Sequence, residues 1–212
     1  MIEKMDNQKI EILHEHYQES FAYIRERERK RDRFFLFLIL LVGALFLQVQ
    51  YPINFKEALG DLNLQNTELN LRAIPLEPLL SVTWTFLMVL SLQYCQLSIN
   101  TERQYTYLHL LEDRLSNAFS DEDIYRREGK VYLDKYPLFS EWAWIFYTIM
   151  FPLIMVVSVP FLLYLELSQL NNAAYYKIYD GLLGLGVIIS FLLYRISPLF
   201  SKRKKSAPVK RA

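Results

Sequence analysis

Four uncharged apolar runs constrain the fold of this chain more than any other feature of its sequence. They cover residues 34–55, 78–101, 142–165 and 181–194. A helix of about 20 mainly apolar residues crosses the ~30 Å hydrocarbon core of a bilayer, and the first three runs are long enough. The fourth is long enough if Arg195 extends its guanidinium into the headgroups. We therefore expect an all-α membrane protein with four transmembrane helices in two hairpins.

The alternative is a soluble helical protein with buried helices. The chain has 212 residues, of which 52% are hydrophobic and 15% aromatic. Apolar runs of this length exceed what a globular core of this size requires, so we favour the membrane interpretation. The lone cysteine, Cys95, lies within the second run and excludes an internal disulfide.

The distribution of basic residues predicts the topology. Lys and Arg number 8 before the first run, 6 in residues 100–142 and 7 from Arg195 onward, whereas the two remaining connections hold only 3. The side richer in Lys and Arg faces the cytoplasm, which places both termini and the central segment there. No small-residue cleavage site follows the first run, so we expect it to remain as an anchor.

These considerations divide the chain into a cytoplasmic amphipathic helix (1–33), a first span (34–55), a periplasmic loop (56–77), a second span (78–99), a cytoplasmic helical segment (100–141), a third span (142–165), a periplasmic turn (166–177), a fourth span (178–198) and a basic cytoplasmic tail (199–212).

The N-terminal segment carries one apolar stripe, formed by residues at helical spacing. Its members are Ile10, Leu13, Tyr17, Phe21 and Ile24. With only Gly43 and no proline before Pro52, we expect one long helix that continues into the first span. The stripe then docks on the central segment or on a second subunit, in preference to lipid, because its polar face is not mainly basic.

The central segment predicts two helices and a protein-docking surface. The first continues the second span, and the second begins after Ser120, an N-cap residue followed by three carboxylates. With 9 acidic and 6 basic residues, the segment is not expected to bind nucleic acid. The candidate docking residues are Arg103, Tyr107, His109, Arg126, Arg127 and Tyr132.

No pattern of residues predicts catalysis or a bound cofactor. His109 and Glu112 have a spacing used in helical metal sites, but no second His-containing pair accompanies them, so we expect no metal. No phosphate-binding glycine loop and no GxSxG is present. A lipid-acting enzyme would need converging carboxylates or histidines, for which only Glu102, His109 and Glu141 come into question, and we expect a non-enzymatic protein.

The second span has one polar face, made by side chains within about a third of the helix circumference. Its members are Ser81, Thr85, Gln93, Gln96 and Asn100. Such residues commonly form hydrogen bonds between helices. The alternative is an oligomer in which this face lines an aqueous path. No charged residue lies deep in any run, which argues against a transporter.

Local features refine the connections and the spans. Residues 62–71 alternate in a manner typical of a small hairpin, although their leucines could equally rest on the membrane surface. Pro152 and Pro160 lie inside the third span and are expected to kink it. Gly181, Gly184 and Gly186 permit close helix approach in the fourth span, although they do not form a GxxxG motif.

The central segment, with ERQYTYLHLLEDRLS followed by REGKVYLDKYPLFSEW, resembles small multi-pass membrane proteins of bacterial antiphage defence systems. One kind is the four-span membrane subunit of Kiwa-type systems, and the other is the membrane effector linked to certain retrons. The four spans fit the first kind better. The resemblance implies a bacterial inner-membrane protein, a homo-oligomer in the lipid bilayer, and a cytoplasmic protein partner encoded nearby.

The expected function is therefore an antiphage defence component that senses a disturbance of the envelope or permeabilises the membrane together with its partner. The alternative is a small oligomeric channel unrelated to defence, with the polar face of the second span lining its pore.

Overall fold

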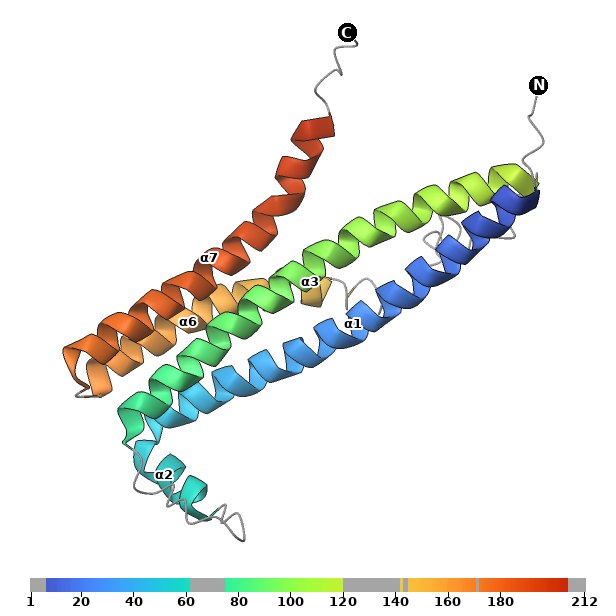
Figure 1. Ribbon diagram of the computed structural model, residues 1–212. Helices are drawn as coiled ribbons and strands as arrows, with labels where there is room; N and C mark the ends of the chain where they lie inside the picture. Colours follow the sequence, from blue (N-terminus) through green and yellow to red (C-terminus); the bar gives the residue numbers. More distant parts are fainter. Residues whose placement is uncertain (1–6, 62–74, 120–141, 143–144, 171, 206–212) are drawn as a thin grey trace. The chain divides into compact units, whose positions relative to one another are not determined.

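The computed structural model describes residues 7–61, 75–119, 142, 145–170 and 172–205. All of its regular elements are helices (Figure 1). They are α1 (Asn7–Gln50), α2 (Pro52–Asp61), α3 (Leu76–Phe119), a π-helical turn η2 (Phe146–Met150), α6 (Phe151–Gln169) and α7 (Ala174–Lys205).

Four of these helices are long and apolar enough to cross a membrane, as the sequence predicts. The candidate spans lie within Ile10–Gln50, Leu76–Ser116, Phe146–Gln169 and Ala174–Ile196. At 44 residues each, α1 and α3 extend for about 66 Å at 1.5 Å per residue. That length is about twice the hydrocarbon core, so each of the two helices continues well beyond its apolar run.

Apolar side chains on all four helices remain exposed on the single chain. A soluble protein rarely leaves so much contiguous apolar surface in water, whereas a bilayer covers it. The most exposed of these residues include Leu36, Phe37 and Leu40 on α1, Val82 and Phe86 on α3, Leu153, Val157 and Tyr164 on α6, and Ile178, Leu182 and Leu193 on α7.

The chain divides into two compact units. Unit 1 comprises Met1–Arg33 and Gln96–Thr148, and unit 2 comprises Phe34–Cys95 and Ile149–Ala212. Helices α1 and α3 each contribute one part to each unit, because their polar ends belong to unit 1 and their apolar ends to unit 2.

Unit 1 is held together by the apolar stripe of the N-terminal segment. Tyr17 and Ile24 of α1 are buried against Leu108, Leu111 and Leu115 of α3, and Leu13, Phe21 and Tyr105 pack at the edge of this cluster. The stripe therefore docks on the central segment, which was one of the two partners expected for it. Tyr107, a candidate docking residue next to the buried Leu108, is 46% exposed.

Unit 2 has a core to which all four helices contribute. The ring of Phe151 on α6 meets Phe35 of α1 edge-on at 4.7 Å between centroids, Tyr94 of α3 at 5.3 Å and Phe191 of α7 at 5.7 Å. Edge-to-face pairs at such distances add stabilisation beyond the burial of their area. Phe151 thus joins the four helices at one level.

Helices α6 and α7 form a hairpin within unit 2 (Figure 1). A Cβ atom on Gly184 would come within 2.7 Å of Leu163 Cδ1, and one on Gly186 within 2.7 Å of Met88 Cε. These two glycines permit the close approach expected of them. Gly181 has open space at this position, so the third glycine of the group does not take part.

Several connections differ from the sequence-based expectations or lie outside the described residues. Helix α2 follows α1 directly after Tyr51, although no helix was expected there. It begins at Pro52, because the fixed backbone angle of proline suits the first helical turn. Pro152 stands in the first turn of α6, next to the π-helical turn, and Pro160 lies inside α6. The possible hairpin at 62–71 and the second central helix lie outside the described residues.

Candidate functional site

Unit 1 contains a buried carboxylate with a partner for each oxygen. Glu112 of α3 is 4% exposed. Its Oε1 accepts a hydrogen bond from the Tyr17 hydroxyl of α1 at 3.3 Å, and its Oε2 lies 3.2 Å from Nδ1 of His109. This arrangement joins the two helices through a polar contact at the edge of their apolar cluster.

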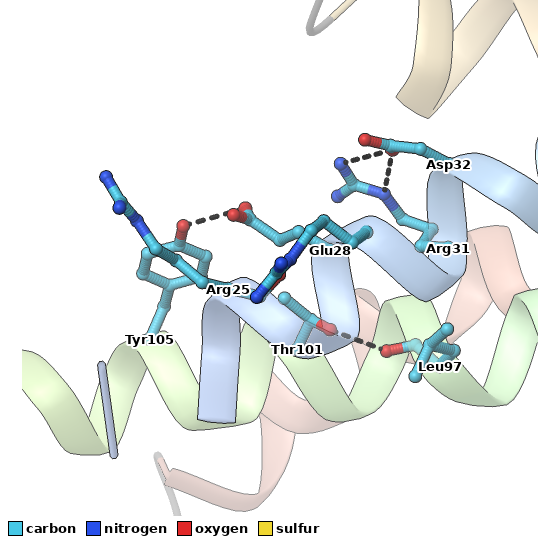
Figure 2. Close-up of polar contacts among 8 residues, drawn as sticks. Arg25, Glu28, Arg31, Asp32, Leu97, Thr101 and Tyr105 are labelled. Atoms are coloured by element: carbon cyan, nitrogen blue, oxygen red, sulfur yellow. Dashed lines mark hydrogen bonds and ion pairs between the residues drawn. The ribbon is translucent and has the colours of Figure 1, made fainter. Parts of the chain in front are cut away.

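A second polar contact joins the same helices closer to the apolar runs (Figure 2). The Tyr105 hydroxyl of α3 donates to Glu28 Oε1 of α1 at 2.8 Å. Residue 17 pairs with residue 112 and residue 28 with residue 105, so the two helices of unit 1 run antiparallel. Nearby, Thr101 donates to the Leu97 carbonyl within α3 at 2.8 Å.

Two ion pairs form within α1 among the alternating charges of residues 25–33. Lys30 lies 2.6 Å from Glu26. Arg31 lies 3.1 Å from Asp32 (Figure 2). The hydrogen bond and the charge of Lys30 lower the pKa of Glu26 below its usual value. The Arg31 guanidinium also lies over the ring of Tyr147, 5.9 Å from its centroid.

The expected docking residues fall into two groups. Arg103, Tyr107 and His109 are exposed on α3. Arg103 and Tyr107 are four residues apart and therefore share one face, which Leu110 (54% exposed) extends. Arg126, Arg127 and Tyr132 lie outside the described residues.

The polar face of the second span divides between the interior and the surface of the chain. Ser81 is buried, and the half-buried Thr85 bonds the Ser81 carbonyl at 2.7 Å and lies 3.1 Å from the Tyr179 hydroxyl of α7. Gln93, Gln96 and Asn100 are exposed. One end of this face therefore holds helices of unit 2 together, while the other end is directed away from the chain.

Two acidic residues lie in the interior of unit 2, where sequence analysis had placed only a periplasmic turn and the start of a span. Glu166 of α6 is 1% exposed, and Asp180 of α7 is 0% exposed. Both residues lie just outside the uncharged runs, and their burial was not predicted from the sequence. The sequence does contain a signal for both residues, because Glu166 directly follows the third apolar run and Asp180 directly precedes the fourth.

Glu166 has hydrogen-bond donors on two sides. The indole nitrogen of the fully buried Trp84 on α3 donates to Oε2 at 2.9 Å. The side-chain nitrogen of Asn172, in the turn after α6, lies 3.5 Å from Oε1. Both oxygens of this buried carboxylate therefore lie close to a nitrogen donor.

Asp180 has a different environment. Among the described residues, neither of its carboxyl oxygens has a hydrogen-bond partner, and the same holds for the hydroxyl of the buried Ser81. Ser81 and Glu166 are nevertheless the side chains that act on Asp180 electrostatically. Three helices therefore direct polar groups to one place in unit 2: α3 with Ser81, α6 with Glu166 and α7 with Asp180.

The arrangement offers oxygen ligands and hydrogen-bond acceptors. Across residues 7–61, 75–119 and the described positions from 142 onward, no group of three or more His, Cys, Asp or Glu side chains could hold a metal ion. Comparison with family models, with curated proteins and with solved structures gave no match to this chain. Its function is therefore argued from its own geometry.

Proposed function

We propose that this chain is a non-enzymatic, multi-pass inner-membrane component of a bacterial antiphage defence system. In this role it senses a disturbance of the envelope, or permeabilises the membrane, together with a cytoplasmic partner. The observation that carries the proposal is the length of α1 and α3, which extend from apolar runs into the polar helix pair of unit 1. The resemblance of the central segment to defence proteins supplies the biological setting.

The physical argument concerns continuity. Neither α1 nor α3 contains a proline inside its bounds beyond the first turn, so each helix carries a displacement along its axis without an interruption. The packing of Tyr17 and Ile24 against Leu108 and Leu111 makes the polar ends of both helices move together. A change in the membrane then reaches the face that carries Arg103 and Tyr107.

The topology of this proposal follows the basic residues. Both termini and unit 1 lie in the cytoplasm, and the turn between α6 and α7 lies in the periplasm. Fluorescent-protein fusions at the C-terminus are expected to fluoresce, whereas alkaline phosphatase fused after residue 170 is expected to be active. The opposite pattern would contradict the topology.

The direct test is phage plating with the chain expressed together with its genetic neighbours. We expect a reduced plating efficiency for at least one class of phage. Deletion of residues 116–135 should leave membrane insertion intact and abolish the protection. The substitution Arg103→Glu with Tyr107→Ala should do the same, while Asp113→Asn on another part of α3 serves as the control. Unchanged plaque counts with the wild-type chain across a broad phage panel would refute the defence role.

A second candidate function, an oligomeric channel, is favoured by one observation. Gln93 and Gln96 are exposed on the single chain although they belong to an apolar span. Polar side chains in a span usually face other helices or water, so these residues are expected at a contact between subunits or in a pore. Planar-bilayer recordings of the purified chain distinguish a pore from a contact between subunits. Conductance that disappears in Gln93→Leu with Gln96→Leu identifies a pore, and a silent wild-type protein excludes it.

A further inference from the structure

The two buried carboxylates of unit 2, Glu166 and Asp180, differ in the hydrogen-bond donors that surround them. Glu166 faces the Trp84 indole at 2.9 Å and the Asn172 amide at 3.5 Å, so both of its oxygens face donors. Asp180 is 0% exposed and has no donor at either oxygen. The hydroxyl of Ser81, which is 7% exposed, is the second polar group there that lacks a partner. Three oxygen atoms are thus left without a bond in the interior.

A buried carboxylate without a donor is strongly destabilised in its charged form. It responds either by taking up a proton or by binding a cation. Among the described residues, the side chains that act on Asp180 are Ser81 and Glu166, and neither carries a positive charge. Lys177, one turn before Asp180 on α7, is half-buried and has its ammonium group 3.4 Å from the Leu167 carbonyl. The negative charge of Glu166 makes a second bare carboxylate less favourable still.

We propose that Asp180, Ser81 and Glu166 form an intramembrane binding site for one monovalent cation, a proton or a sodium ion. Asp180 and Ser81 supply the free oxygens, and Glu166, whose oxygens face Trp84 and Asn172, supplies the second carboxylate.

The occupant of this site controls the packing of three helices. With the cation bound, Ser81 of α3, Glu166 of α6 and Asp180 of α7 are attracted to one centre. Without it, Asp180 and Glu166 repel each other, and Asp180 retains an unpaired charge in the interior. Among the described residues, the charges of Glu77 of α3 and Asp180 both act on Tyr176 of α7, and neither Glu77 nor Tyr176 carries a positive charge. The inference is independent of any role in defence.

The test is thermal unfolding of the purified full-length chain in detergent. The unfolding midpoint is measured from about pH 5 to about pH 9 in sodium chloride and in choline chloride of equal ionic strength. If a proton is the occupant, we expect the midpoint to fall by about 4 °C or more with rising pH in both salts. If sodium is the occupant, we expect the fall in choline chloride alone. A midpoint that depends on neither pH nor sodium overturns the proposal.

Two variants and a control localise the effect. Asp180→Asn removes the charge and should abolish the dependence on pH and sodium, and Asp113→Asn, an exposed carboxyl on α3, should retain it. Persistence of the full dependence in Asp180→Asn also overturns the proposal. Should that variant not fold, Ser81→Ala provides the second measurement. Ser81 favours the charged form of Asp180, so its removal should raise the pH of the transition if a proton binds. If sodium binds, the variant lacks one oxygen ligand and sodium affinity should fall about tenfold. Wild-type behaviour of Ser81→Ala would then overturn the proposal.

Discussion

Glu112 in unit 1 and Asp180 in unit 2 are both buried carboxylates, yet their surroundings differ. Glu112 is 4% exposed and meets Tyr17 and His109, one at each oxygen. Asp180 is 0% exposed and meets no donor. In unit 1 the carboxylate contributes to the contact between two helices, because its charge is compensated by hydrogen bonds. In unit 2 the carboxylate lacks such hydrogen bonds, so its charged form is stable only with a positive charge close to it.

The two units also use their helices differently. In unit 1 the apolar residues of α1 form one stripe, and the rest of the helix surface carries charges that pair locally. In unit 2 the helices are apolar on the inner and the outer faces, as Phe35 and Leu38 are buried while Leu36, Phe37 and Leu40 are exposed. A helix that is apolar all round suits lipid, and a helix with one stripe suits water.

The largest expected effect is the loss of stability when the aromatic core of unit 2 is disrupted. Phe151→Ala removes the ring that meets Phe35, Tyr94 and Phe191, and should destabilise unit 2 by about 3–5 kcal/mol. Thermal unfolding in detergent measures this loss. Phe161→Ala on the same helix is the control, since Phe161 is 51% exposed and should cost less than about 1 kcal/mol. Equal losses in the two variants would contradict the aromatic core.

Removal of the carboxylate in unit 1 comes next. Glu112→Ala leaves the Tyr17 hydroxyl without its acceptor and should destabilise the helix pair by about 1.5–3 kcal/mol, the range for hydrogen bonds to charged groups. Hydrogen exchange of the α1 amides in residues 10–33 measures the local loss.

Asp180→Asn should act in the opposite direction on unit 2 at high pH, because it removes an uncompensated charge. Destabilisation of similar size in both variants would remove the contrast between the two carboxylates.

The contact between Tyr105 and Glu28 is expected to contribute less. Tyr105→Phe removes a hydroxyl that donates at 2.8 Å in a half-buried position and should cost about 1 kcal/mol in unit 1. The same exchange measurement detects it. Tyr107→Phe is the matched control, because Tyr107 is exposed and its variant should retain wild-type protection.

The smallest effect concerns the exposed pair of Glu26 and Lys30. Lys30 lowers the pKa of Glu26 from its ordinary value of 4.5, so the pair stabilises α1 above that pH and loses its contribution as the pH falls through the lowered value. The exchange rates of the surrounding amides should therefore rise on acidification, and Glu26→Gln should remove this component. An identical acid response in wild type and variant would show that the pair contributes nothing.

The sequence suffices to predict the spans and the docking of the N-terminal stripe. The spans follow from uncharged runs, and the stripe follows from the spacing of Leu13, Tyr17 and Ile24, both of which are local properties. Tyr107 is exposed because its neighbour Leu108 fills the inward position, and adjacent residues on a helix point about 100° apart. Helix α2 is missed because a proline after an aromatic residue marks an end as readily as a beginning.

The buried carboxylate site could not be predicted from the sequence alone. Ser81, Glu166 and Asp180 come from three helices, and only tertiary packing decides whether acidic residues at the ends of apolar runs turn inward or toward water. The polar face of α3 shows the same limitation. Helical spacing places Ser81 and Gln93 on one face, but the neighbouring helices of unit 2 cover Ser81 and leave Gln93 exposed.

The composition of unit 1 has a consequence for biosynthesis. Its two packed segments are separated by residues 34–95, so the ribosome completes the stripe of α1 long before Leu108, Leu111 and Leu115 exist. During that interval Tyr17, Phe21 and Ile24 have no native surface to cover them. Only a chain whose second apolar helix has been integrated correctly returns α3 to the waiting N-terminal segment. A nascent chain with a topological error therefore keeps an apolar stripe exposed in water, which is the kind of feature that chaperones and membrane proteases recognise.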